Sequence, residues 1–100
     1  LKELNLDGSK VTVAGLGLAK ALPRLRVLSL NDTGVTDADA AALAGMPDLT
    51  ELRVGRTGLT DAGAKELAKS KSLAEVWVHD TKVTDAGVIA LAGLPKLRKI

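Results

Sequence analysis

The chain has 100 residues, of which 46% are hydrophobic, yet it contains one Trp and no Phe, Tyr or Cys. Without cysteine it can form neither a disulfide nor a thiolate metal site, and the redox compartment stays undetermined. The net charge of +2, with no run of five or six like charges, does not favour nucleic acid as a partner. No apolar stretch is long enough to insert across a membrane as a helix.

The sequence repeats itself every 24 residues. Its rows are residues 1–24, 25–48, 49–72 and 73–96, and residues 97–100 start a fifth row. Framework columns keep their character from row to row, as in Leu28, Leu52 and Val76. A fixed period of this length indicates a solenoid, in which each unit buries its apolar face against its neighbours. We therefore predict a single repeat array over residues 1–100 that forms part of a longer chain.

Each row predicts one strand followed by one helix. The opening of row two places Leu28 and Leu30 on one face of a short strand. Because the same polar turn follows every strand, successive strands must run parallel. A Thr-Asp-Ala motif then favours a helix start, since the hydroxyl accepts an amide and the carboxylate suits the positive end of the dipole. In chain order, we expect strands near 3–6, 27–30, 51–54 and 75–78, and helices near 14–21, 37–44, 61–69 and 85–92.

The predicted helices bury a stripe of residues spaced three apart. In row two the stripe includes Ala40 and Leu43, and in row four it includes Val88 and Leu91. Row three has Ser70 where the equivalent positions of the other rows are apolar. We expect this polar side chain to weaken the core locally.

The aspartates of the helix-start motif form a column: Asp37, Asp61 and Asp85. They could hold a cation, but the helix dipole explains each of them separately, so we expect no metal. Two rows depart from the pattern. Row one has Val13 in this column, and row two has Asp39 where later rows have Gly, which completes a capping box with Thr36.

The shared motif L-x-x-L-x-L-x-x-T-x-V-T-D-A-G resembles a leucine-rich repeat. It is similar to the 24-residue bacterial form, with Thr where many relatives carry Asn, and the resemblance covers all 100 residues. It implies an α/β fold, a leucine-rich-repeat solenoid with a parallel β-sheet on the concave side and short α-helices on the convex side. It also implies partner binding in general without naming the partner.

The strand residues that face away from the core would form the concave surface. They stand third, fifth and seventh in each row and vary while the framework columns stay constant. We predict that a protein or peptide partner binds these side chains: Glu3, Asn5, Asp7, Val27, Ser29, Asn31, Glu51, Arg53, Glu75, Trp77 and His79.

Trp77 and His79 are the most distinctive residues of this set. Trp77 is the only aromatic side chain, and it could either dominate partner binding or lie flat against Arg53 as simple cover. His79 stands beside Asp80, but no second His, no Cys and no nucleophile accompanies it. We therefore expect no catalytic residue, no metal, no cofactor and no enzymatic activity.

The leading functional hypothesis is a non-catalytic recognition module that binds a protein or peptide on the concave sheet. The alternative is a structural subunit or scaffold segment that docks through its repeat ends. Leu4 and Leu6 open the array, and Leu97 and Ile100 close it, without polar capping segments. Unpaired strand edges also template association. We expect flanking sequence or another chain to cover both ends, and the cellular compartment stays undetermined.

Overall fold

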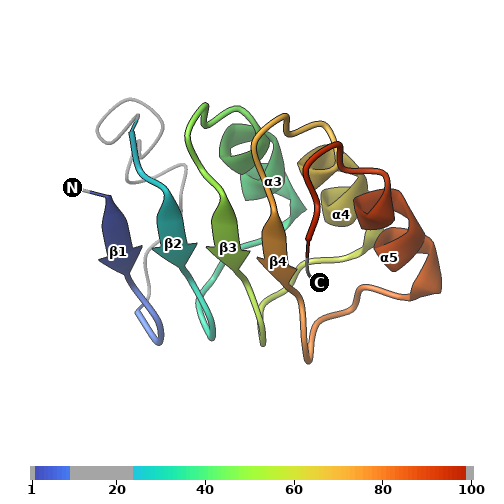
Figure 1. Ribbon diagram of the computed structural model, residues 1–100. Coiled ribbons are helices and arrows are strands. Elements are labelled where there is room, and N and C mark those ends of the chain that lie inside the picture. The colour runs from blue at the N-terminus through green and yellow to red at the C-terminus, as the bar shows by residue number, and fades with distance from the viewer. Residues whose placement is uncertain (1, 10–23, 99–100) are drawn as a thin grey trace.

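Four parallel strands form one sheet, and three helices pack against one side of it. The computed structural model of the protein describes residues 2–9 and 24–98. The strands are β1 (Glu3–Asn5), β2 (Val27–Ser29), β3 (Glu51–Arg53) and β4 (Glu75–Trp77), and they lie in the order β1-β2-β3-β4. The helices are α3 (Asp37–Ala44), α4 (Asp61–Leu67) and α5 (Asp85–Ala92). Figure 1 shows strands and helices stacked in chain order, which makes the fold an α/β repeat solenoid.

The strand register has the same 24-residue period as the sequence. Leu28 pairs with Leu52, and Leu52 pairs with Val76, all in parallel. Beyond β4, the Arg98 amide donates to the Ala74 carbonyl at 2.7 Å, so the ladder continues into the fifth row. The prediction of one parallel strand per row is confirmed.

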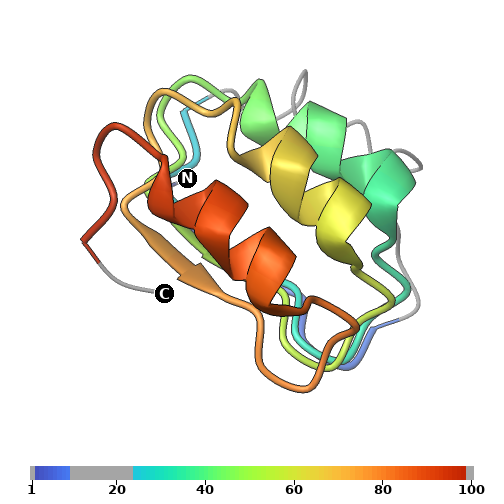
Figure 2. The same ribbon diagram turned by 90° about the vertical axis from the view of Figure 1, so that its right-hand side faces the viewer.

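The core lies between the sheet and the helix layer, as Figure 2 shows from the end of the stack. It consists of the inward strand residues and the helix residues that face them, because these positions are shielded by neighbouring rows on both sides. Its fully buried members include Leu28, Leu30, Leu43, Leu52, Val54, Leu67, Val76 and Leu91. At the edges of the stack, Leu4, Leu6, Val78 and Leu97 are only partly buried against this core.

Element boundaries differ slightly from those expected. Helices α3 and α5 span the predicted residues, whereas α4 ends at Leu67 instead of residue 69. The Lys69 and Ser70 amides donate to carbonyls three residues back, at 3.1 and 3.0 Å, so the chain tightens into a turn there. Each strand has three residues instead of the expected four. The helix expected near 14–21 lies outside the described residues.

The Ser70 hydroxyl has hydrogen-bond partners, which reduces the expected cost of a polar side chain in this apolar column. The Ser70 side chain is buried, but its hydroxyl accepts hydrogen bonds from the Ser72 amide at 3.2 Å and the Leu73 amide at 3.1 Å. A buried hydroxyl with partners avoids the cost of an unsatisfied polar group. Ser70 therefore ends the helix-to-strand loop with hydrogen bonds where the other rows use an apolar side chain.

The expectation that Val88 belongs to the buried stripe of the last helix is wrong. Val88 stands in the column of Ala40 and Ala64, which are fully buried, yet it is 38% exposed. Ala64 is covered because Gly87 of α5 approaches its Cβ. Among the described residues no further helix packs against α5 in this way. The next residue, Ile89, is 72% exposed.

The turn that follows each strand has the same construction in all four rows. A hydroxyl donates to the carbonyl three residues earlier, at 2.7 Å in every case; these donors are Ser9, Thr33, Thr57 and Thr81. One residue before each hydroxyl, the backbone is left-handed, with φ between 53° and 74°. These residues are Gly8, Asp32, Arg56 and Asp80.

Candidate partner-binding site

The strand geometry places one row of side chains on the outer side of the sheet. Successive residues of a strand point to opposite faces, so burying Leu52 in the core turns Glu51 and Arg53 outward. The concave face, as used below, is this outer side of β1–β4 together with the seventh residue of each row. Its side chains are not equally accessible, and they divide into three groups.

The first group is a cluster over β3 and β4. The guanidinium of Arg53 lies 4.2 Å from the centre of the Trp77 ring, which is within the range of a cation–π interaction. The same guanidinium donates through Nε to the Glu51 carboxylate at 2.6 Å. Parallel register makes this possible, because Arg53 and Trp77 are direct neighbours across the strands. The ring is therefore held in place from one side and partly exposed.

The second group lines an open hollow of about 290 Å³ beside this cluster. It lies over β1 and β2, and Arg53 forms its wall toward β3. The other concave-face side chains that line it are Glu3, Asn5, Val27 and Ser29. The hollow exists because the outward residues of β1 and β2 are shorter than Arg53 and Trp77.

The third group holds adjacent rows together. The Asp7 carboxylate accepts from the Ser29 hydroxyl at 2.6 Å and from the Asn31 amide at 2.8 Å. The Asn31 side-chain oxygen in turn accepts from the Gly55 amide at 2.8 Å. Ser29 is 3% and Asn31 is 9% exposed. Both side chains are therefore largely covered by their bonds to neighbouring rows, although Ser29 still lines the open hollow.

His79, the seventh residue of row four, contacts the preceding row through its ring. Its imidazole lies across Gly55, and a Cβ atom on that glycine would collide with the ring. Any larger residue at position 55 would push the imidazole away. His79 is exposed on its outer side, at the edge of the sheet next to Trp77.

A hydrogen-bond ladder along the helix starts was not foreseen from the sequence. Asp37 accepts from the Thr60 amide at 2.8 Å and from the Thr60 hydroxyl at 2.5 Å. Asp61 accepts in the same way from Thr84, at 2.6 and 2.5 Å. The sequence predicts that each aspartate interacts only with the dipole of its own helix. In the structure, Asp37 and Asp61 instead accept hydrogen bonds from the residue that begins the helix of the next row.

These bonds lower the pKa of both carboxyl groups. Burial raises the pKa of Asp37, but hydrogen bonds from the Thr60 hydroxyl, the Thr60 amide and the Gly63 amide together outweigh it. Hydrogen bonds from the Thr84 hydroxyl and amide lower the pKa of Asp61. Both values lie below the ordinary 3.8. The ionised form of each aspartate is the one that the fold stabilises.

Acid should therefore destabilise the fold. A carboxyl group whose pKa is lower in the folded state stabilises it fully above the ordinary pKa and loses that contribution as pH falls through the lowered pKa. The urea midpoint should drop as the pH falls below the ordinary carboxyl pKa of 3.8 and through the lowered pKa values. The drop should be less steep in Asp37→Asn, which keeps one acceptor oxygen but cannot ionise. Equal slopes for the wild type and this variant, followed by circular dichroism, would contradict the role of Asp37.

Neither a metal centre nor a spanning helix emerges from the described part of the chain. Residues 2–9 and 24–98 contain no group of three His, Cys, Asp or Glu side chains placed to bind a metal ion. In the same residues, every helix is too short or too polar to cross a membrane.

Comparison with known families supports the repeat assignment. The family model for a leucine-rich repeat matches residues 22–44 and 45–68, two consecutive stretches that each have about the length of one row but begin a few residues before it. These two stretches, which together make up slightly less than half of the chain, are similar to leucine-rich repeats. No curated protein matches the chain.

Two solved structures share the fold. Leiomodin-1 actin-binding site 2 is similar with a TM-score of 0.70 and 20% identity, over 98% of this chain and 68% of that one. An internalin from Listeria monocytogenes str. 4b F2365 is similar with a TM-score of 0.53 and 18% identity. The internalin match covers 99% of this chain and 40% of the internalin chain. At these identities the likeness establishes the fold.

Proposed function

We propose that this chain is a non-catalytic recognition module that binds a protein or peptide on its concave face. The observation that carries the proposal is the cluster of Arg53 and Trp77 beside an open hollow. Tryptophan and arginine are the residues most often found where binding energy is concentrated. That leiomodin-1, with a similar fold, carries an actin-binding site in this domain is consistent with a binding role.

The arrangement favours a partner that lies across the strands. One face of the Trp77 ring is stacked on Arg53, so its position is set before a partner arrives and little side-chain entropy is lost on binding. Glu75 forms no ion pair with a described residue, unlike Glu51, which is neutralised by Arg53. A partner would place an apolar group against Trp77 and a basic group near Glu75.

The expected result is a large loss of affinity when the cluster is removed. Peptides selected from a displayed random library should bind the wild-type chain and change the emission of Trp77, its only tryptophan. The double variant Arg53→Ala/Trp77→Ala should bind the same peptides about 30-fold more weakly or worse, by fluorescence anisotropy of the labelled peptide.

A matched control lies on the helix side. Lys65→Ala/Ile89→Ala also removes one cation and one large apolar side chain, both exposed on helices. It should leave peptide affinity unchanged, and circular dichroism should show both double variants folded. If the control loses affinity and the concave variant keeps it, the concave face is not the site.

The alternative of a structural subunit that docks through its repeat ends also has an observation in its favour. Ile89 is 72% exposed, in a column occupied by Ala41 and Lys65 in the preceding rows. Val88, the preceding residue of α5, is also exposed, so the two give this helix an apolar surface, and contiguous apolar surface marks interaction sites. Self-association that Ile89→Lys abolishes and Arg53→Ala/Trp77→Ala leaves intact would favour this alternative.

A further inference from the structure

Charged residues are sorted between the two edges of the sheet. At one edge, the upper one in Figure 1, helices end and loops lead into the strands; at the other, strands end and helices begin. In the described residues, the basic side chains of the strand-end edge are Arg56 and Lys82. The same edge carries more acidic side chains: Asp7, Asp32, Asp37, Asp61, Asp80 and Asp85. The strand-start edge is basic instead. A net charge of +2 hides this separation.

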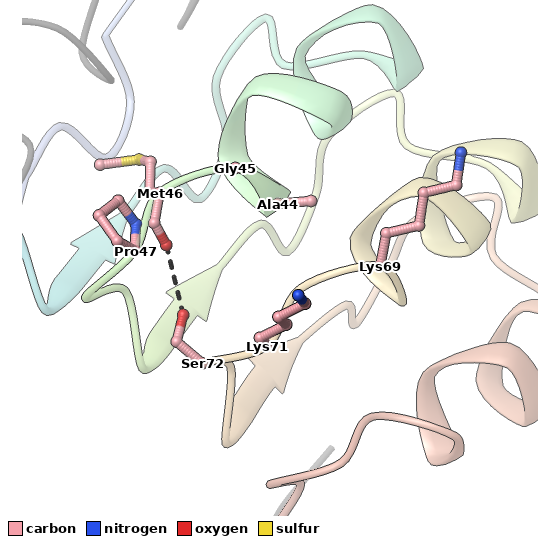
Figure 3. A pocket seen from close by; sticks show the side chains of 7 residues that line it. All are labelled: Ala44, Gly45, Met46, Pro47, Lys69, Lys71 and Ser72. Atoms are coloured by element: carbon pink, nitrogen blue, oxygen red, sulfur yellow. Dashed lines mark hydrogen bonds between the residues drawn. The ribbon is translucent and has the colours of Figure 1, made fainter.

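The basic edge is also hollowed along its length. Three open hollows of about 440, 320 and 520 Å³ lie on it. Neighbouring hollows share lining residues: Pro47 and Ser72 belong to the first two, and Arg26 and Thr50 to the last two. The three hollows are therefore neighbours along this edge, and together they are called the furrow below. Figure 3 shows its first part, where Lys69 and Lys71 lie across from Ala44, Gly45 and Pro47.

Basic side chains predominate in this furrow. Five line it, and they are called the basic rim below: Lys2, Arg26, Lys69, Lys71 and Lys96. The acidic side chains in it are Glu3 and Asp48. Lys69 pairs with Glu66 at 3.2 Å, while the other four basic residues form no ion pair with a described residue.

Helix electrostatics do not account for the basic rim. The negative end of a helix dipole favours a nearby cation, which is reason enough for Lys69 just beyond α4. Lys2, Arg26 and Lys71 lie outside the helices, in loops and at strand starts. None of these three residues forms an ion pair with a described residue. They are free to meet an anionic partner.

We propose that the basic rim binds an extended acidic peptide segment of a partner protein. With strands about 4.8 Å apart, the furrow spans roughly 15 Å, the length of about five extended residues. Carboxylates of the peptide meet the lysines and arginines, and apolar side chains of the peptide meet Pro47 and Val27. The furrow meets the concave hollow at Glu3 and Val27, whereas neither Arg53 nor Trp77 lines it.

Single-stranded nucleic acid fits the furrow less well. Sequence-independent binding of single strands relies on aromatic side chains that stack on the bases. The only aromatic residue of the chain is Trp77, which lies on the concave face and not on the basic rim. Asp48 and Glu3 would also repel a backbone that is charged at every unit, whereas a peptide can place an uncharged residue opposite them.

The test uses a fluorescein-labelled hexapeptide of alternating glutamate and leucine and the 100-residue chain. The wild type should bind it, more weakly as salt is added, and should not bind the matched peptide with glutamine for glutamate. Lys71→Glu/Lys96→Glu should weaken binding about tenfold in fluorescence anisotropy. The control Lys65→Glu/Lys82→Glu changes the net charge equally, away from the furrow, and should weaken binding less than about twofold.

Four outcomes would overturn the proposal. They are no binding of the acidic peptide by the wild type, equal losses in both double variants, loss in the folded variant Arg53→Ala/Trp77→Ala, and tighter binding of a thymidine hexanucleotide at the same rim. Self-association of the wild type that Lys71→Glu/Lys96→Glu abolishes would make a second copy the occupant instead. Urea midpoints of both charge variants establish that each is folded, so that a loss of peptide binding is not mistaken for unfolding.

Discussion

Leu52→Ala should lower the free energy of unfolding by about 2–5 kcal/mol. Leu52 is 0% exposed and lies in β3 between Leu28 and Val76 of the adjacent strands. Removing its side chain loses apolar burial and leaves a cavity that neighbours on both sides are too constrained to fill. In a stack of repeats, such a defect weakens the interfaces with both adjoining rows. The measurement is the midpoint and slope of urea unfolding.

Thr60→Ala should lower the free energy of unfolding less than Leu52→Ala does. It removes a hydroxyl that accepts from the Ala62 amide at 3.3 Å and donates to Asp37 at 2.5 Å. Loss of such a helix cap costs about 0.5–2 kcal/mol, because water can replace part of the interaction at this partly exposed position. Equal urea midpoints for Leu52→Ala and Thr60→Ala would contradict the claim that packing in the central rows dominates stability.

Gly63→Ala should destabilise the fold by about 1–3 kcal/mol, against the usual trend for helices. Within a helix, alanine is normally more stable than glycine by roughly 0.5–1 kcal/mol. At position 63, however, the new Cβ would overlap the Asp37 carboxylate and the Leu59 side chain. The carboxylate cannot move aside without losing its bonds to Thr60. The steric penalty therefore exceeds the gain in helix propensity.

Gly45→Ala is the matched control for Gly63→Ala. Gly45 ends α3 with φ of −82°, and the nearest atoms to a Cβ there are backbone oxygens at 3.6 and 3.7 Å. Alanine fits without strain, so this change should be neutral or slightly stabilising. A urea midpoint of Gly63→Ala at or above that of the wild type would show that Asp37 does not occupy the position that its hydrogen bonds to Thr60 require.

The fold could be read from the sequence because each strand and helix depends on local residues repeated in register. The framework leucines specify which strand face is buried, and the Thr-Asp-Ala motif specifies where each helix starts. The contacts between rows were harder to foresee, because they join residues 22 to 26 positions apart. Which way the Asp37 side chain turns, toward its own helix or toward Thr60, depends on packing that no single row specifies.

One signal for the ladder was nevertheless present in the sequence. Gly63 and Gly87 each follow a row that has Asp at the helix start, namely Asp37 and Asp61. Row two has Asp39 in the glycine column, and the row before it has Val13 in the aspartate column. The glycines leave room for the carboxylates of the preceding row. A glycine is therefore needed where the preceding row has an aspartate at its helix start, and this one rule accounts for both departures in the sequence.

The concave face was predictable in outline only. Alternation along the strands identified which residues leave the core, and this holds for Glu51, Arg53 and Trp77. It could not show that Asn31 would be buried by its bond to Gly55, or that His79 would cover that glycine. Accessibility at the seventh position depends on side-chain length in two adjacent rows, which a single row does not reveal.

The ladder of Asp37 to Thr60 and Asp61 to Thr84 also bears on how the length of this protein can change. Rows two and three each offer a carboxylate to the row after them, and rows three and four each offer a hydroxyl to the row before them. Duplicating or deleting row three would rejoin a carboxylate to a hydroxyl, whereas deleting one residue between Asp37 and Thr60 would shift these two partners relative to each other and break that bond. Genetic change in steps of 24 codons should therefore be tolerated far better than change in any smaller step.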